Sequence, residues 1–578
     1  MLLASPAGAQ FYLRGEVRDD KGQPLSNAKL LLHSNKLIYY SGDAGSFGIA
    51  VAQEADSMTV SMEGYFSLVV AVKASAFQRI TLQSIQGATK SPRNNLASFT
   101  KDFTHQEGQR WTVAAETYSA LVENEFIEAR RFPETGFAIR TDRASYSNIR
   151  RFLNMDTRVP PDAVRIEELM NYFNFNYQPP PKDSMFNYRS VLSDCPWNPE
   201  NMLLFLHICS RKIDPEKIPP SNLVFLIDIS GSMDMPNRLP LLKSAFKLLV
   251  DNLRTRDTVS IVVYGSSVGV WLPPTAGNEK EKIRKSIEQL YPGGSTPGAS
   301  GILTAYRLAR SQFIKGGNNR VILATDGDFN VGASNEDELE ELISKEKQYG
   351  IYLSCLGVGM GNYKDSKLEI LAKKGNGNFA YLDNEEEAEK VMVKEFTQTL
   401  YSVADNAYLN VRLNPDLVKE YRLIGYDNKL RALADSLSEV EGGDIGSGHS
   451  MLALMEIKPV PGLRQGKLAS VAEGLANVCI HYQLPGDSMV LQSSYRCPPR
   501  YQVFSAIPRD YQFASAVAMF AFLIKESDYA KGFNWNDVLI MADQSMNPED
   551  AVQQEFVDMV EKARKIYGRS RRHRKLIW

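Results

Sequence analysis

Asp228, Ser230 and Ser232 form a D-x-S-x-S pattern directly after the apolar run 223–227. A carboxylate and two hydroxyls at this spacing offer only hard oxygen atoms, which suit Mg²⁺, Mn²⁺ or Ca²⁺ rather than zinc or copper. The same pattern also suits a helix start, where Asp228 would complement the helix dipole and a polar side chain would cap the first turn. The pattern alone therefore leaves a metal site and a plain helix start as alternatives.

A D-x-S-x-S pattern that follows a buried strand resembles the metal-binding signature of von Willebrand factor type A (VWA) domains. The resemblance implies two further ligands, a threonine in a later loop and an aspartate that ends a later strand. The segment G-G-S-T-P-G supplies Thr296, and the segment A-T-D-G-D supplies Asp326. Asp328 either orients a metal-bound water or bonds only its own turn. The expected metal ligands are Asp228, Ser230, Ser232, Thr296 and Asp326.

The expected ligand set favours Mg²⁺, with Mn²⁺ and Ca²⁺ as alternatives. Mg²⁺ demands near-octahedral geometry and gives up its waters reluctantly, so few protein carboxylates are expected to bind it directly. Three hydroxyls and one direct carboxylate would leave excess positive charge and an open position. The resemblance implies that an Asp or Glu of a partner protein fills that position. Loops 231–237, 293–299 and 328–335 would then select the partner, and family analogy implies a shift of helix 385–401 on opening.

Residues 220–402 alternate strand and helix patterns, which predicts a doubly wound parallel sheet with helices on both faces, as in the Rossmann-like VWA fold. The expected strands cover 223–227, 259–264, 321–324, 352–358 and 379–382. One helix is predicted by an apolar stripe at helical spacing, formed by Leu239, Leu242, Phe246, Leu249 and Leu253. Another should run from a cap at Ser334 to an end at Gly350. Because every crossover is expected to contain a helix, loops at the carboxyl edge of the sheet should build the site.

The segments around the VWA region resemble the flanks of a bacterial VWA family. The N-terminal flank, 133–219, carries R-T-D-R-A-S-Y and P-P-D-A-V-R-I-E-E, with Arg140 and Arg143 where the family usually has acids. The C-terminal flank, 403–510, carries Y-R-L-I-G-Y and I-G-S-G-H. Strand patterns at 408–413, 451–457, 476–484 and 489–495 predict antiparallel strands with one solvated face. Both flanks are expected to form a β-sandwich that presents the VWA domain.

Residues 511–578 are expected to form a helical C-terminal segment, because Phe513, Val517, Phe520 and Leu523 return to helical spacing. Its basic end, 564–575, is interpreted as a solvated, frayed terminus, with a docking patch as the alternative.

Residues 11–83 alternate short strand patterns with turns and resemble a carboxypeptidase-regulatory-like β-sandwich. The resemblance rests on G-x-V-x-D, G-x-P-L, D-x-G-x-F and E-G-Y, and it implies no peptidase chemistry. Residues 84–132 are expected to be a linker that ends in a short helix from 111 to 132. Residues 1–10 end in P-A-G-A-Q, which favours a truncated signal peptide. We therefore expect a periplasmic, outer-membrane-associated or secreted protein, with the cytoplasm as the alternative.

The composition is that of a globular protein whose positive and negative charges nearly balance. The chain has 578 residues, 43% hydrophobic residues and a formal net charge of −2, so nothing draws it to nucleic acid or to an anionic membrane. No apolar run approaches the ~20 residues that span a bilayer, and 513–524 is interpreted as a buried helix. The five cysteines predict no disulfide framework and no zinc site. Cys355 is expected in the core, whereas one or two bridges among the other four stay open.

Three other functions compete with metal-dependent protein binding. The segment 265–269 matches the G-x-S-x-G of hydrolases, but that motif needs a helix after it, and 268–272 predicts a strand. The six histidines are scattered and none pairs clearly with a nucleophile, so we expect no enzyme. A chelatase-type subunit would need its ATPase motor in trans, since the chain has no G-x-x-x-x-G-K-[ST] loop. A scaffold with a purely structural metal is the third alternative.

Overall fold

The protein folds into two compact units, Met1–Asn95 and Leu96–Trp578. The computed structural model describes residues 11–25, 28–34, 38–41, 45–51, 53–62, 65–83, 116, 118, 123–139, 142–175, 177–214, 217–265, 268–294, 298–327, 336–360, 363, 365–395, 401–426, 442–465, 474–487 and 489–573. The expected signal remnant, 1–10, and most of the expected linker, 84–122, lie outside these residues.

The first unit is a small β-sandwich. One sheet has the order β4-β1-β7 and the other the order β3-β2-β5-β6. Their strands are β1 (Phe11–Asp19), β2 (Lys29–Leu32), β3 (Ile38–Tyr40), β4 (Ser46–Val51), β5 (Ala55–Ser61), β6 (Leu68–Lys73) and β7 (Gln78–Leu82). The two sheets share one core, to which Leu13 and Ile49 contribute from the first sheet and Leu30 and Val60 from the second. This arrangement confirms the expected sandwich fold of 11–83.

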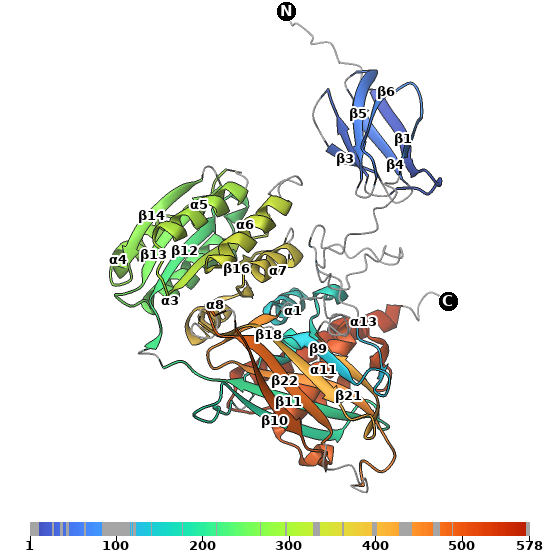
Figure 1. The fold of residues 1–578 in the computed structure, drawn as a ribbon, viewed down its shortest axis with the longest axis vertical. Coiled ribbons are helices and arrows are strands. Elements are labelled where there is room, and N and C mark those ends of the chain that lie inside the picture. Colours follow the sequence, from blue (N-terminus) through green and yellow to red (C-terminus); the bar gives the residue numbers. More distant parts are fainter. Residues whose placement is uncertain are drawn as a thin grey trace, which may run out of the picture. The chain divides into compact units, whose positions relative to one another are not determined.

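The VWA region of the second unit contains a six-stranded sheet with helices on both faces (Figure 1). Its order is β14-β13-β12-β15-β16-β17. The strands are β12 (Ser221–Asp228), β13 (Thr258–Tyr264), β14 (Gly269–Ala276), β15 (Asn318–Thr325), β16 (Ile351–Val358) and β17 (Phe379–Leu382). The expected parallel sheet is wrong at one edge, because β14 pairs antiparallel with β13. Only residues 265–268 separate these two strands, and a parallel crossover needs a dozen or more residues.

The helices of this region divide between the two faces of the sheet. They are α3 (Leu239–Asp251), α4 (Lys280–Glu288), α5 (Gly298–Ser311), α6 (Glu336–Gln348), α7 (Asp365–Lys374), α8 (Glu385–Glu389) and the π-helical turn η4 (Lys390–Lys394). Along β12, Phe225 packs into the core under α3 and α4, and Leu226 packs into the core under α5, α6 and α7. The last helix expected here, 385–401, is thus α8 followed by η4, and 396–400 lie outside the described residues.

The two flanks fold together as a second sandwich. Its first sheet has the order β24-β10-β11-β21-β19-β8, and its second the order β20-β18-β22-β23, with β9 also paired to β18. The strands before the VWA region are β8 (Ile127–Glu128), β9 (Glu134–Ala138), β10 (Phe186–Asp194) and β11 (Met202–Ser210). Those after it are β18 (Ser402–Leu413), β19 (Val418–Ile424), β20 (Gly443–Gly446), β21 (Ser450–Pro459), β22 (Ala476–Gln483), β23 (Val490–Cys497) and β24 (Tyr501–Gln502). Because β11 pairs antiparallel with β21, the VWA region is an insertion within this sandwich.

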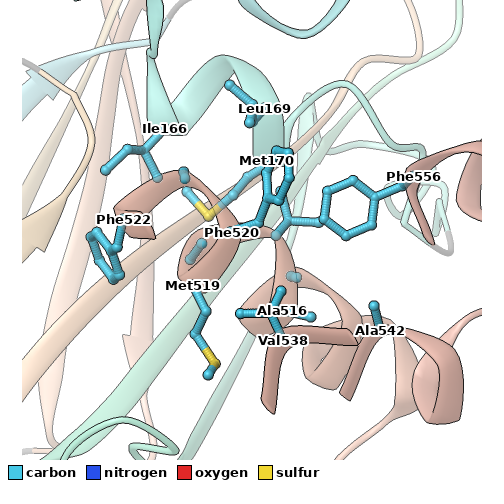
Figure 2. Packing of buried hydrophobic residues seen from close by; sticks show 14 of the residues in the cluster. Ile166, Leu169, Met170, Ala516, Met519, Phe520, Phe522, Val538, Ala542 and Phe556 are labelled. Atoms are coloured by element: carbon cyan, nitrogen blue, oxygen red, sulfur yellow. The ribbon is translucent and has the colours of Figure 1, made fainter. Parts of the chain in front are cut away.

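A helical layer covers the outer face of the first flank sheet. It contains α1 (Ala144–Asn154), α2 (Ile166–Met170), α11 (Arg509–Ile524), α12 (Trp535–Ser545) and α13 (Ala551–His573). Figure 2 shows Met170 of α2, Phe520 of α11 and Phe556 of α13 in the core of this layer. The layer contradicts the solvated face expected for 451–457: Leu454 of β21 packs under the helices, and Met455 packs between the two sheets. The alternating pattern is present, but both faces are buried.

Two further expectations are wrong in the described part of the chain. A helix is expected at 111–132. The described residues of this segment form no helix and contain the strand β8, which pairs with β19. The basic end expected to fray continues as α13 as far as His573, and the Tyr567 hydroxyl accepts a hydrogen bond from the Val159 amide at 3.1 Å.

All five cysteines are free thiols, and Cys355 is buried in β16 as expected. Among the described residues, no helix is long and apolar enough to cross a membrane.

Buried ion pairs join the VWA region to the flank helices. Arg165, just before α2, pairs with Asp365 and with Glu369 of α7. Arg143 forms a partly buried ion pair with Glu395 after η4. Backbone groups contribute too, because the Phe379 amide donates to Asp142 Oδ1 at 2.8 Å. These contacts fix the end of the VWA region to the helical layer.

Candidate metal centre

The D-x-S-x-S loop lies where β12 ends, at the carboxyl edge of the VWA sheet. Asp228 is the last residue of β12 and is 1% exposed, whereas Ser232 is exposed to solvent. The Ser230 amide donates to Asp228 Oδ1 at 2.8 Å, and the Ser230 and Ser232 hydroxyl oxygens lie 3.0 Å apart. The strand therefore carries the carboxylate inside the protein, and the loop brings the two hydroxyls beside it at the surface.

Two neighbouring strands hold the Asp228 carboxylate in place. The Tyr264 hydroxyl, at the end of β13, donates to Asp228 Oδ2 at 3.1 Å. The Thr325 hydroxyl, at the end of β15, donates to the same oxygen at 2.9 Å. Burial raises the pKa of Asp228, and the charge of nearby Asp326 raises it further, while the bonds from Ser230 and Thr325 lower it. Among the described residues no cationic side chain forms an ion pair with Asp228.

Asp326 follows β15 and is 5% exposed. Its Oδ2 accepts a hydrogen bond from Arg238 Nη1 at 2.8 Å. The same guanidinium also donates to the Ser232 carbonyl and, from Nη2, to the Met360 carbonyl at 2.8 Å. Arg238 therefore joins the three loops that follow β12, β15 and β16.

Close backbone approach at this edge depends on glycine. A Cβ on Gly265, which follows β13 with φ +154°, would lie 2.7 Å from the Ile229 carbonyl carbon. The Gly293 amide donates to the Ile229 carbonyl at 2.6 Å, and the Gly231 amide donates to the Gly294 carbonyl at 3.0 Å. The loop that leads toward Thr296 thus lies against the D-x-S-x-S loop. Thr296 itself and Asp328 lie outside the described residues.

The described residues fit a divalent cation bound by hard oxygens. Four of the five expected ligands meet at one edge of the sheet, because the parallel pairing of β12 with β15 brings the ends of these strands, where Asp228 and Asp326 stand, side by side. Asp228 is a buried carboxylate without an ion-pair partner among the described residues, a costly arrangement that a cation would relieve. No group of three or more His, Cys, Asp or Glu side chains gathers in the described part of the chain, at this edge of the sheet or elsewhere. The candidate centre therefore relies on hydroxyls as well as carboxylates, as Mg²⁺ sites with few carboxylates do.

Several residues of this centre were not predicted as parts of it. Thr325 belongs to the A-T-D-G-D segment, yet no periodicity indicates that its hydroxyl points to Asp228. Tyr264 is simply the last residue of an expected strand, and its hydroxyl reaches Asp228 because β12 and β13 pair in register. Arg238 carries no signal in the sequence, since its partner Asp326 is 88 residues away.

A histidine next to a nucleophile lies elsewhere, in the flank sandwich. His207 Nε2 lies 2.7 Å from the Ser450 hydroxyl and 3.5 Å from the Cys209 sulfur. The expectation that no histidine pairs with a nucleophile is wrong here, because pairing of β11 with β21 brings together residues 243 positions apart. All three side chains are buried, and burial, followed by the charge of Arg189, lowers the pKa of His207 to about 4.

The G-x-S-x-G segment at 265–269 leads into the strand β14. A nucleophile elbow needs a helix at this place, so the segment does not form one.

Comparisons with known proteins agree with this architecture. A model of the von Willebrand factor type A domain matches residues 222–396, and one described as von Willebrand factor matches 112–205. A model described as "Uncharacterized protein YfbK, C-terminal" matches 398–566. YfbK of Escherichia coli (strain K12) is 36% identical over 466 residues, which cover 77% of this chain and 80% of that protein. This chain belongs to the YfbK family.

Membership in the YfbK family confirms the VWA resemblance and includes both flanks. The likeness of 11–83 to a carboxypeptidase-regulatory-like domain stays a prediction. The magnesium-chelatase 67 kDa subunit of Chlorobaculum tepidum is 30% identical over 178 residues, which make up 28% of this chain and 28% of that protein. A von Willebrand factor type A structure from Catenulispora acidiphila is 14% identical, with a TM-score of 0.40, and covers 67% of this chain and 91% of that chain. The VWA domain suggests a role in protein–protein interaction.

Proposed function

We propose that this protein binds a partner protein through a divalent cation, most suitably Mg²⁺, at the carboxyl edge of the VWA sheet. Asp228, Ser230, Ser232, Asp326 and Thr296 would hold the cation. The cation supplies positive charge for an Asp or Glu of the partner. The chain's own residues orient the carboxylates and keep the site open at Ser232.

The observation that carries this proposal is the burial of the Asp228 carboxylate and the way its neighbours hold it. Its carboxylate is buried and its pKa is raised by burial, yet Tyr264 and Thr325 fix it with two donated hydrogen bonds. A residue needed only to start a helix would lie at the surface, where its charge costs little. A buried carboxylate held beside two hydroxyls is better suited to bind a cation.

The first test is cation binding by the full chain. We expect Mn²⁺, titrated by isothermal calorimetry, to bind one site in wild type and to bind at least tenfold more weakly in Asp228→Asn. The asparagine keeps the size of the side chain and removes its charge. Asp543→Asn, at an exposed position of α12, is the matched control and should bind as wild type does. Equal binding by all three proteins would contradict the proposed site.

The second test is partner capture from an envelope extract. Wild type and Asp228→Asn would each be used with Mg²⁺ and again with EDTA. A partner retained only by wild type and only with Mg²⁺ is the expected result. Retention in all four conditions would assign binding to the sandwiches and a structural role to the metal. Capture of an ATPase would instead favour the chelatase-type subunit.

The proposed location is the bacterial cell envelope: periplasmic, outer-membrane-associated or secreted. The support is the P-A-G-A-Q segment and the resemblance of 11–83 to domains of envelope proteins. Fractionation of the source cells with an antibody to the chain should place it in the envelope or medium. Its recovery with cytosolic proteins alone would contradict this location.

A further inference from the structure

Arg238 is the one cationic side chain that the described residues place on a carboxylate of the candidate centre. It lies just before α3, and its side chain is 13% exposed. Its pairing with Asp326 adds one positive charge beside two carboxylates. Counted together with Arg238, the two described carboxylates of the centre leave one net negative charge rather than two.

The surroundings of Arg238 are built to hold its guanidinium there. Two backbone carbonyls, of Ser232 and Met360, accept hydrogen bonds from its Nη1 and Nη2 atoms, whereas Nε is buried and has no partner among the described residues. Gly359 has φ +80°, and a Cβ at this position would lie 2.5 Å from Arg238 Nε. Only a residue without a side chain leaves room for the guanidinium, so its position over Asp326 is specified by three separate loops.

We propose that Arg238 sets the charge of the candidate metal centre by pairing permanently with Asp326. The inference rests on the proposed function and names a residue that tunes it. Of the two described carboxylates, Asp228 is the one that a guanidinium does not balance, and the charge of Arg238 lowers the affinity for the cation. In the loaded centre the same pairing leaves more positive charge for a partner's carboxylate. Arg238 is a positioning residue, since it acts on the cation through Asp326.

If Arg238 sets the charge of the centre, Arg238→Gln should raise the affinity for Mn²⁺; if it only supports the loops, the affinity should fall. Glutamine removes the positive charge and keeps hydrogen-bond donors. If charge decides, Arg238→Gln should bind Mn²⁺ about tenfold more tightly than wild type, because a like charge has been removed from the site. If Arg238 only supports the loops, its loss should weaken Mn²⁺ binding. Arg238→Lys keeps the charge without the planar fork, so it should bind Mn²⁺ within about threefold of wild type.

The experiment is a calorimetric Mn²⁺ titration of the full chain in wild type, Arg238→Gln, Arg238→Lys and Asp228→Asn. Melting temperatures in EDTA identify any variant that does not fold. Tighter binding by Arg238→Gln alone supports the proposal. Unchanged or weaker binding by Arg238→Gln, or equal tightening in Arg238→Lys, overturns it.

The same titration separates this inference from the proposed function. If wild type binds no Mn²⁺ while Arg238→Gln does, Arg238 controls the charge as proposed, but the native chain is not a metal-dependent binder. If neither protein binds, both proposals fail. If wild type binds and Asp228→Asn does not, the site stands and the variants at position 238 decide the role of Arg238.

Discussion

Arg150 of α1 donates two hydrogen bonds to Asp383, from Nε to Oδ2 at 2.8 Å and from Nη2 to Oδ1 at 2.5 Å. Asp383 directly follows β17, the last strand of the VWA sheet. The same guanidinium contacts Glu387 of α8 at 2.7 Å and Glu555 of α13 at 2.9 Å. One arginine of the N-terminal flank thus joins the VWA region to the C-terminal helices. The VWA region ends in a fixed joint rather than a free linker.

Replacement of Arg150 by methionine should destabilise this joint strongly. Methionine keeps much of the side-chain volume but leaves Asp383 and Glu387 buried without the ion pairs that they make with Arg150. The free energy of unfolding should fall by about 3–5 kcal/mol, as for other broken buried ion pairs. Urea denaturation monitored by circular dichroism measures the change. Lys531→Met, which removes an exposed pair with Asp528, is the control and should have little effect. Similar midpoints for the two variants would contradict the structural role of Arg150.

His207 and His449 should make the protein sensitive to acid. Burial, together with a nearby arginine, lowers the pKa of His207 to about 4 and that of His449 to about 3, from 6.5. As the pH falls from 6.5 toward 4, the unfolded chain takes up protons that the folded chain does not, so stability is lost. His207→Gln should reduce the loss of unfolding free energy between pH 7 and pH 5 by about 2 kcal/mol. Urea denaturation at both pH values tests this, with exposed His33→Gln as control. An unchanged pH dependence in His207→Gln would show that His207 is not buried in the neutral form.

Gly359→Ala should affect both stability and cation binding. Alanine at φ +80° costs about 1–2 kcal/mol, and the added Cβ would also displace the Arg238 side chain. We expect a lower melting temperature and tighter Mn²⁺ binding, in the same direction as Arg238→Gln. Gly22 has the same φ of +80° but has no atom within 4 Å of an added Cβ, so Gly22→Ala is the matched control. Gly22→Ala should lose stability only through its backbone conformation, and its Mn²⁺ binding should be unchanged. Weaker Mn²⁺ binding in Gly359→Ala would argue that Arg238 supports the site instead of tuning its charge.

Phe556→Ala should show that the C-terminal helix belongs to the core. The Phe556 ring contacts the rings of Phe173, Phe513 and Phe520 with edge-on geometry, at centroid distances of 5.6, 5.3 and 5.1 Å. Removing it leaves a cavity and should lower the free energy of unfolding by about 3–5 kcal/mol. Chemical denaturation measures the loss. Phe66→Ala, at a side chain that is 58% exposed, should cost less than about 1 kcal/mol. Equal effects of the two substitutions would place α13 outside the cooperative core.

The local patterns of the chain predicted the elements that carry the site. The apolar run before Asp228 forms β12, and the stripe from Leu239 onward forms α3. These predictions succeed because periodicity and burial are set by neighbours in the sequence. The pattern at 451–457 predicted a strand correctly, but it could not show that helices cover its outer face. The short connection at 265–268 was a signal for the antiparallel β14, and it was missed.

The sequence by itself determined the type of domain and indicated the candidate ligands, because the D-x-S-x-S pattern stands in one loop and follows a recognisable strand. Only the tertiary structure decided which arginine forms an ion pair with which carboxylate. Arg238 meets Asp326, and Arg150 meets Asp383, across 88 and 233 residues respectively. Such pairings depend on the order and register of strands, which non-local backbone hydrogen bonds and the packing of side chains between layers select.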